Sequence, residues 1–145
     1  MKQFLAALTL ALAFSFAAAY AQQAASQPQT NPNTTPAYSM LILRKVEVGA
    51  ELEKFLKDYD TEHPRAKRLQ FELDALRREM KKMMEFVEPQ VSKLTSGYGS
   101  LILRRVTLES DIQSLLLEYT SDWPEVKDKQ TELQLLDKEI AKVLK

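Results

Sequence analysis

Apolar residues recur at alternating intervals of three and four along the chain from residue 41 onward. This spacing predicts helices that pack along a seam, because the same face returns every seven residues. The first run is Leu41, Val48, Leu52, Phe55 and Tyr59, with the basic Lys45 between its first two members. After a break the spacing resumes in Ala66, Leu69, Leu73, Leu76, Met80, Met83 and Val87. The short apolar run 41–48 would also suit a strand, but the continuous heptad favours a helix.

The pattern occurs twice, because residues 38–85 align without a gap with residues 98–145, at an offset of 98 − 38 = 60. Of the 48 aligned pairs 16 are identical, where chance at ordinary composition gives roughly 3 or 4. The second copy carries the same spacing in Leu101, Arg105, Leu108, Ile112, Leu115 and Tyr119, and in Val126, Lys129, Leu133, Leu136, Ile140 and Val143. A tandem duplication of one unit of two helices is the simplest explanation.

Each unit is interrupted at the same place, before Pro64 in the first copy and before Pro124 in the second. Proline suits the first turn of a helix and disfavours helical conformation in the residue before it. The polar residues that precede each proline are candidates to cap the second helix or to interact favourably with its dipole. They are Thr61, Glu62, Ser121 and Asp122. Each copy is therefore predicted to form an αα-hairpin, with a single bent helix as the alternative.

The first helix of each copy is apolar around more of its circumference than one partner helix requires. The residues that make this face broad are Leu41, Ile42, Leu43, Val46, Leu101, Ile102, Leu103 and Val106. We interpret them as a candidate interaction surface, because such a face must be buried against something besides its hairpin partner. The two hairpins could cover each other in a four-helix bundle, or an oligomeric coiled coil could cover them. The fold class is all-α in either case.

The hairpins are predicted at 38–88 and 98–145, joined by a hinge at 89–97. Val87, Val91 and Leu94 keep the seam spacing, so helix is expected to continue past a kink at Pro89. Some equivalent positions differ in charge sign between the copies, namely Arg65 and Glu125, Arg68 and Asp128, Arg77 and Asp137. This contrast predicts that the hairpins attract each other, with a solvated face as the alternative.

Residues 1–21 have the pattern of a secretory signal peptide. Lys2 supplies the positive start, an apolar run extends from Phe4 to Ala19, and Ala19-Tyr20-Ala21 fits a cleavage site before Gln22. The alternative is an uncleaved membrane anchor. Residues 22–37 carry no charge and little hydrophobic mass, so a disordered linker is expected. These features predict a periplasmic or secreted protein without stable membrane insertion after cleavage.

Composition excludes several classes of function. Lys+Arg and Asp+Glu both number 20, so no overall field favours a nucleic acid partner. There is no Cys and one His, which removes disulfides and His-based metal clusters. His63 is replaced by Trp123 in the second copy, so a turn-packing role is favoured over a catalytic one. Asp58, Asp60 and Glu62 could hold a cation, but a solvated turn is favoured. No catalytic, cofactor-binding or metal site is predicted, and an enzyme is not expected.

The turn Tyr59-x-x-x-His63-Pro64, with its flanking heptads, resembles the periplasmic coiled coil of bacterial polysaccharide chain-length determinants. The second copy keeps Tyr119 and Pro124. The flanking membrane helices and kinase motifs of that family are not found here. The resemblance implies hairpin geometry and an envelope context, and it transfers no functional residue.

Three functions are compatible with this sequence. The first is a non-enzymatic, exported coiled-coil protein of the bacterial envelope that binds itself or another envelope protein. The second is a small periplasmic holdase chaperone, which would leave apolar surface accessible to unfolded chains. The third, an accessory of polysaccharide export, rests on the resemblance. The first function predicts that the apolar faces are sealed, by the other hairpin or by a second subunit.

Overall fold

The computed structural model describes residues 31–145. The expected signal peptide at 1–21 and most of the expected linker lie outside the described residues. Within the described part, none of the helices has the length and apolar character needed to span a bilayer.

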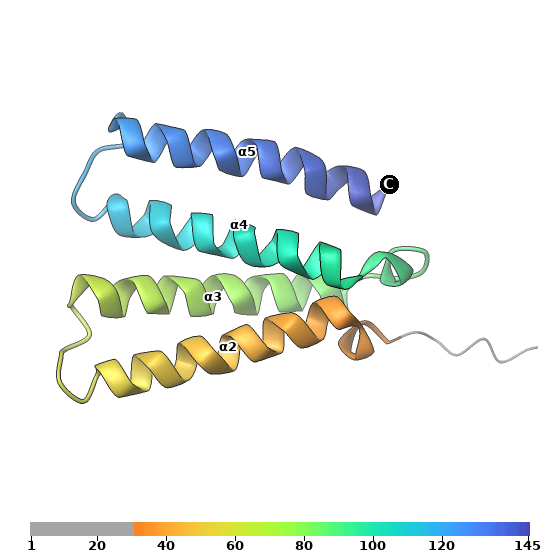
Figure 1. The fold of residues 1–145 in the computed structure, drawn as a ribbon, viewed down its shortest axis with the longest axis horizontal. Helices are drawn as coiled ribbons and strands as arrows, with labels where there is room; N and C mark the ends of the chain where they lie inside the picture. Colours follow the sequence, from red (N-terminus) through yellow and green to blue (C-terminus); the bar gives the residue numbers. More distant parts are fainter. Residues whose placement is uncertain (1–30) are drawn as a thin grey trace, which may run out of the picture.

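Four long helices account for most of the described chain (Figure 1). They are α2 (Pro36–Phe55), α3 (Pro64–Met84), α4 (Ser96–Leu115) and α5 (Pro124–Leu144). Two short 3-10 helices, η1 (Pro32–Thr34) and η2 (Val91–Lys93), precede α2 and α4. The all-α prediction is confirmed, and the strand alternative for 41–48 is wrong because the heptad continues through that run. The bent-helix alternative is wrong too, because each copy folds into two separate antiparallel helices (Figure 1).

The helix starts follow from local chemistry. Thr35 and Thr95 cap α2 and α4, since each hydroxyl accepts a hydrogen bond from the backbone N–H three residues on. Pro64 and Pro124 occupy the first turns of α3 and α5. Thr61, Glu62, Ser121 and Asp122 do not hold the cap positions at these two starts, and Trp123, which does so at α5, makes no side-chain cap hydrogen bond. His63 takes the cap position of α3, where its Nδ1 accepts from Arg65 N at 3.1 Å.

Two expected boundaries differ in the structure. The linker is expected to reach residue 37, but η1, the Thr35 cap and the buried Ala37 order residues 31–37. The Ala37 N–H also donates to the Leu94 carbonyl, which ties this segment to the connection before α4. Helix is expected to continue past Pro89, but α3 ends at Met84. Leu94 therefore does not extend α3; it follows the separate 3-10 helix η2 and is buried in the core.

The two hairpins share an internal ion pair that their duplication explains. Arg44 of α2 donates to Glu72 of α3 through Nε at 2.7 Å. Arg104 of α4 donates to Glu132 of α5 through Nε at 2.9 Å. These four residues occupy equivalent positions in the two copies, so each copy folds as the same unit.

The hairpins pack unequally, and this decides where surface remains. Extensive contacts join α2 to α3 and α4 to α5 within the hairpins, and α3 and α2 to α4 between them. Helix α4 therefore has three neighbours, whereas α5 packs mainly on α4. The bundle is consequently open beside α5, which lies at one side of the molecule in Figure 1.

The core lies along the predicted seams of α2 and α3, where Leu41, Leu76 and Met83 are fully buried. On α4, Ile102 and Val106 enter this core although they lie outside the predicted seam, whose Leu101 is half-buried. The equivalent seam of α5 is shallower, since only Val126 and Ile140 are buried there. The central unit of the fold is thus a three-helix core to which α5 adds an outer layer.

Truncating the equivalent leucines Leu76 and Leu136 tests this asymmetry. Leu76 is fully buried, so Leu76→Ala is expected to lower the free energy of unfolding by about 2–5 kcal/mol. Leu136 is half-buried, and Leu136→Ala is expected to cost about half as much, because less surface and a smaller cavity are involved. Denaturant unfolding of both variants measures the difference. Equal losses would contradict the outer position of α5.

Candidate interaction surface

The structure separates the eight residues of the predicted interaction surface. Ile42 and Val46 of the first copy are 41% and 60% exposed, but Ile102 and Val106 of the second copy are each 1% exposed. Leu43 is also exposed, whereas Leu101 and Leu103 are half-buried and Leu41 belongs to the core. The surface therefore survives in the first copy alone. Within one chain the other hairpin covers this face on α4 and leaves it uncovered on α2.

The exposed part of α2 forms a continuous stripe. Its members recur at helical spacing, so they share one face of the helix. We call Ser39, Ile42, Leu43, Val46 and Ala50 the α2 stripe; all five are exposed. The equivalent residues of α4 are buried or half-buried, namely Gly99, Ile102, Leu103, Val106 and Ser110. The first hairpin covers them, because α4 packs on α2 and α3 while α2 has no such neighbour on that face.

A second exposed stripe lies on α5, and sequence reasoning missed it. We call Glu132, Leu135, Glu139 and Val143 the α5 stripe; all four are exposed. Their equivalents in α3, Glu72, Ala75, Glu79 and Met83, are all buried. The signal that could have revealed it is Leu135, an apolar residue outside the heptad seam. Leu135 is 58% exposed, whereas Ala75 is 1% exposed.

Arg105 holds the two hairpins together electrostatically. From the middle of α4 it reaches Glu79 of α3 through Nη1 at 3.3 Å and Asp137 of α5 through Nε at 3.0 Å. Glu109, one turn further along α4, lies 3.2 Å from the same Nε and also pairs with Arg78 of α3. Its partners therefore neutralise a largely buried guanidinium, which would otherwise be costly.

Ion pairs join the two hairpins, but most of them do not involve the residues whose charge differs between the copies. Of the six contrasting residues, only Arg68 bridges the hairpins, through Asp111 at 2.8 Å. Arg65 and Arg77 pair within their own hairpin, with Glu51 and Asp74. The other bridges between hairpins come from Arg78 and Arg105.

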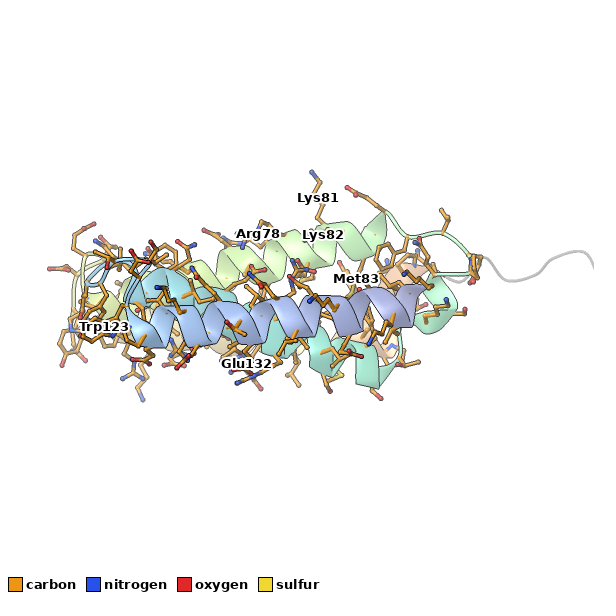
Figure 2. The ribbon with its side chains drawn as sticks, turned by 90° about the horizontal axis from the view of Figure 1, so that it is seen from above. Arg78, Lys81, Lys82, Met83, Trp123 and Glu132 are labelled. Carbon is orange, nitrogen blue, oxygen red and sulfur yellow. The ribbon has the colours of Figure 1, made fainter. Side chains whose placement is uncertain are left out.

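Both hairpin turns lie at one end of the bundle (Figure 1). Their aromatic residues Tyr59, Tyr119 and Trp123 are exposed. Tyr59 stacks on Phe55 with centroids 4.4 Å apart, and the His63 ring contacts both. In the second turn Trp123 stacks on Tyr119 at 4.9 Å, and Figure 2 shows Trp123 at this end. The stacking accounts for the tyrosine kept in both copies. The histidine and tryptophan pack in the turns.

A groove of about 450 Å³ runs between α3 and α5 over α4. It exists because α3 and α5 make little contact with each other. Its lining mixes apolar and charged residues: Phe71, Asp74, Arg78, Glu109, Ile112, Gln113 and Leu133. This lining would suit the side of a peptide or helix better than a small apolar ligand.

Three acidic residues, Asp60, Glu72 and Glu79, have structural roles. In the first turn Asp60 accepts hydrogen bonds from the backbone N–H groups of Glu62 and His63. The buried carboxylates of Glu72 and Glu79 are paired with Arg44 and with Lys82 and Arg105. Across residues 31–145, no three acidic or histidine side chains are arranged to hold a metal ion.

Comparison of the chain with protein-family models, curated proteins and solved structures finds no match. The surfaces described above are therefore the basis for inferring function.

Tyr98 of α4, which lies near Glu79 of α3, makes the free energy of unfolding depend on pH. Burial of its ring, aided by the nearby Glu79 carboxylate, raises the pKa of Tyr98 to about 12. The unfolded chain releases this proton near pH 10, while the folded chain retains it. The contribution of Tyr98 to the free energy of unfolding is therefore fully present below pH 10. Between pH 10 and pH 12 it falls by about 1.4 kcal/mol per pH unit.

Denaturant unfolding between pH 9 and 11 tests this dependence. Tyr98→Phe is expected to lose stability less steeply with pH than the original protein, because it has no phenol to titrate at this site. Tyr38→Phe, at the equivalent position of the first copy, controls for loss of a tyrosine. The same slope in Tyr98→Phe and the original protein would contradict the assignment.

Proposed function

We propose that this protein is a non-enzymatic interaction module that is exported to the bacterial cell envelope and binds a protein partner, a second copy of itself or another envelope protein, through the α2 stripe. The observation that carries the proposal is the exposure of Ile42, Leu43 and Val46 side by side on a well-formed helix. Single exposed apolar residues are common, but a contiguous apolar stripe on a helix is typical of a docking surface. Docking would remove these three side chains from water.

Charge around the stripe also supports a protein partner. Lys45 and Glu47 flank Val46 along α2, and a polar rim around an apolar centre is the usual composition of a protein interface.

The export part of the proposal rests on residues 1–21, with Gln22 as the expected N-terminus of the mature protein. Mass spectrometry of the envelope fraction measures that terminus, and a retained Met1 would favour an anchor instead.

Photo-cross-linking in living cells tests the proposed surface. A photoreactive residue at Leu43 should form adducts with protein, because Leu43 is 62% exposed within the stripe. The same residue at Lys81 is the control, since Lys81 is exposed on α3 and points away from the bundle (Figure 2). An adduct at Leu43 with no counterpart at Lys81 would support the proposal. Equal labelling at both sites, or none at Leu43, would refute it.

Aspartate substitutions at Ile42 and Ile102 give a matched prediction. Ile42→Asp is expected to leave helicity and stability almost unchanged while abolishing the Leu43 adduct, because it places a charge on an exposed docking surface. Ile102→Asp buries the same charge in the core and is expected to cost at least about 3 kcal/mol of unfolding free energy. Circular dichroism and denaturant unfolding measure both. Similar losses in the two variants would contradict the different environments of the copies.

The holdase alternative is supported by a different observation. The groove between α3 and α5 and the exposed aromatic rings at the turns offer separate places for segments of an unfolded chain. A holdase should suppress aggregation of an unfolded client at near-equal stoichiometry, and Ile42→Asp alone should reduce this little. A docking module should have no such effect on aggregation. This assay therefore separates the two functions.

A further inference from the structure

The duplication leaves each outer helix of the bundle, α2 and α5, with one half of an interface that already exists inside the chain. Inside the chain, α4 of the second copy packs on the α2–α3 hairpin of the first. The α2 stripe is equivalent to the α4 face buried in this contact. The α5 stripe is equivalent to the α3 face buried in it. Both halves are exposed because each repeat contacts only its neighbour, which leaves the outer face of each of the two copies uncovered.

We propose that these halves meet between molecules, so that α2 of a second copy of this chain packs on the α4–α5 hairpin of the first. The inference rests on the proposed function, since it identifies the partner of the α2 stripe. The contact would repeat the internal packing of α4 on α2 and α3. Ile42, Val46 and Ala50 would take the places of Ile102, Val106 and Ser110, with similar or identical side chains.

The closest backbone contact of the internal interface can be reproduced between copies. At the start of α4, a Cβ on Gly99 would lie 2.9 Å from Ala37 Cα and 3.0 Å from the Met40 sulfur, so glycine is required there. Between copies, Ser39 would replace Gly99, and it would face Gly97 and Ser100 instead of Ala37 and Met40. Inside the chain the small residue is Gly99 on the incoming helix; between copies the incoming helix carries Ser39 and the small residue is Gly97 on the receiving helix. A shape complementary to Ser39 is therefore available on α4.

Charge supports the same pairing. Lys45 is equivalent to Arg105, but its own hairpin offers Gly49 and Arg77 where Arg105 has Glu109 and Asp137. Among the described residues Lys45 forms no ion pair. A second copy would bring Lys45 to Glu139, the equivalent of Glu79. Glu79 is the acidic partner that the first hairpin supplies to Arg105. A neighbouring molecule would supply the equivalent residue, Glu139, to Lys45.

Other charges make the contact between copies weaker than the internal one. The internal pair Arg68–Asp111 becomes Asp128 facing Glu51, although Arg65 neutralises Glu51 at 2.8 Å. The internal pair Arg78–Glu109 becomes Lys138 facing Gly49. We therefore expect reversible association that depends on protein concentration.

The geometry is head-to-tail, because two different surfaces meet. Such a contact leaves one free α2 stripe and one free α5 stripe in every assembly, so growth continues until a ring closes. A twofold dimer that pairs two α2 stripes is the main alternative arrangement. It would bury the same apolar residues but would not involve α5.

Complementary blocking of the two stripes distinguishes these arrangements. Val46→Asp blocks the α2 stripe and leaves the α5 stripe intact, whereas Leu135→Asp does the reverse. The measurement is solution mass by analytical ultracentrifugation over a range of concentrations. Leu117→Asp is the control, because Leu117 is exposed at the turn end, away from both stripes. Circular dichroism verifies that each variant keeps its helices.

The original protein and Leu117→Asp are expected to gain mass in steps of one chain as concentration rises. Val46→Asp and Leu135→Asp should each stay monomeric, with self-association weakened at least about a hundredfold. Their equimolar mixture should form a dimer and nothing larger, because only one productive pair of stripes remains. Dimers of Leu135→Asp alone would instead indicate pairing of two α2 stripes and overturn the proposal.

Two further outcomes separate this inference from the proposed function. If the original protein stays monomeric up to about 1 mM while Leu43 still cross-links to a different protein in cells, self-assembly is overturned and the interaction module stands. If it assembles through surfaces that neither aspartate variant affects, the pairing of the two stripes is overturned; if Leu43 also forms no adduct in cells, the interaction module is overturned as well.

Reversal of the predicted ion pair is an independent test of register. Lys45→Glu and Glu139→Lys are each expected to weaken association about fivefold, since each places like charges opposite each other. Both changes in one chain should restore it, because the two substituted side chains would again carry opposite charges across the contact. Lack of restoration would overturn this register.

Discussion

The packing of α4 against the first hairpin is the contact on which the rest of the structure depends. It buries Ile102 and Val106, brings Gly99 against Ala37, and places Arg105 within reach of acids on two other helices. Without it, each hairpin would be a pair of helices with a broad apolar face in water. Such a pair buries too little surface to be stable alone. The contact therefore creates both the core and the unequal environment of the two copies.

This inequality explains why identical residues have different roles. Glu72 and Glu132 pair with equivalent arginines, yet Glu72 is buried and Glu132 is exposed. Helix α3 packs against both α2 and α4, whereas α5 packs mainly on α4 and leaves Glu132 exposed. Substitutions follow the same logic, because the small Ala75 is buried on α3 where that helix packs on its neighbours, whereas the larger Leu135 lies on a face of α5 that no helix of the described chain covers. The divergence of the copies thus records which surfaces remain free.

The same reasoning connects stability with recognition. A face that stabilises the protein when its own chain covers it becomes a binding surface when its copy is left uncovered. Ile42 and Val46 have this character, since their equivalents are fully packed in the core. The groove and the turn-end aromatics lack an internal counterpart of this kind, so the chain offers no template for what would occupy them.

The sequence by itself determined the local structure. The heptads, the threonines before α2 and α4 and the prolines at the starts of α3 and α5 specify four helices and their turns, because these signals act within a few residues. The 60-residue repeat likewise determined that both hairpins are alike. Only the tertiary structure decided which apolar face is covered and that Arg105 bridges three helices. Two copies in tandem have one internal interface, and the repeated pattern cannot show which copy contributes which side of it.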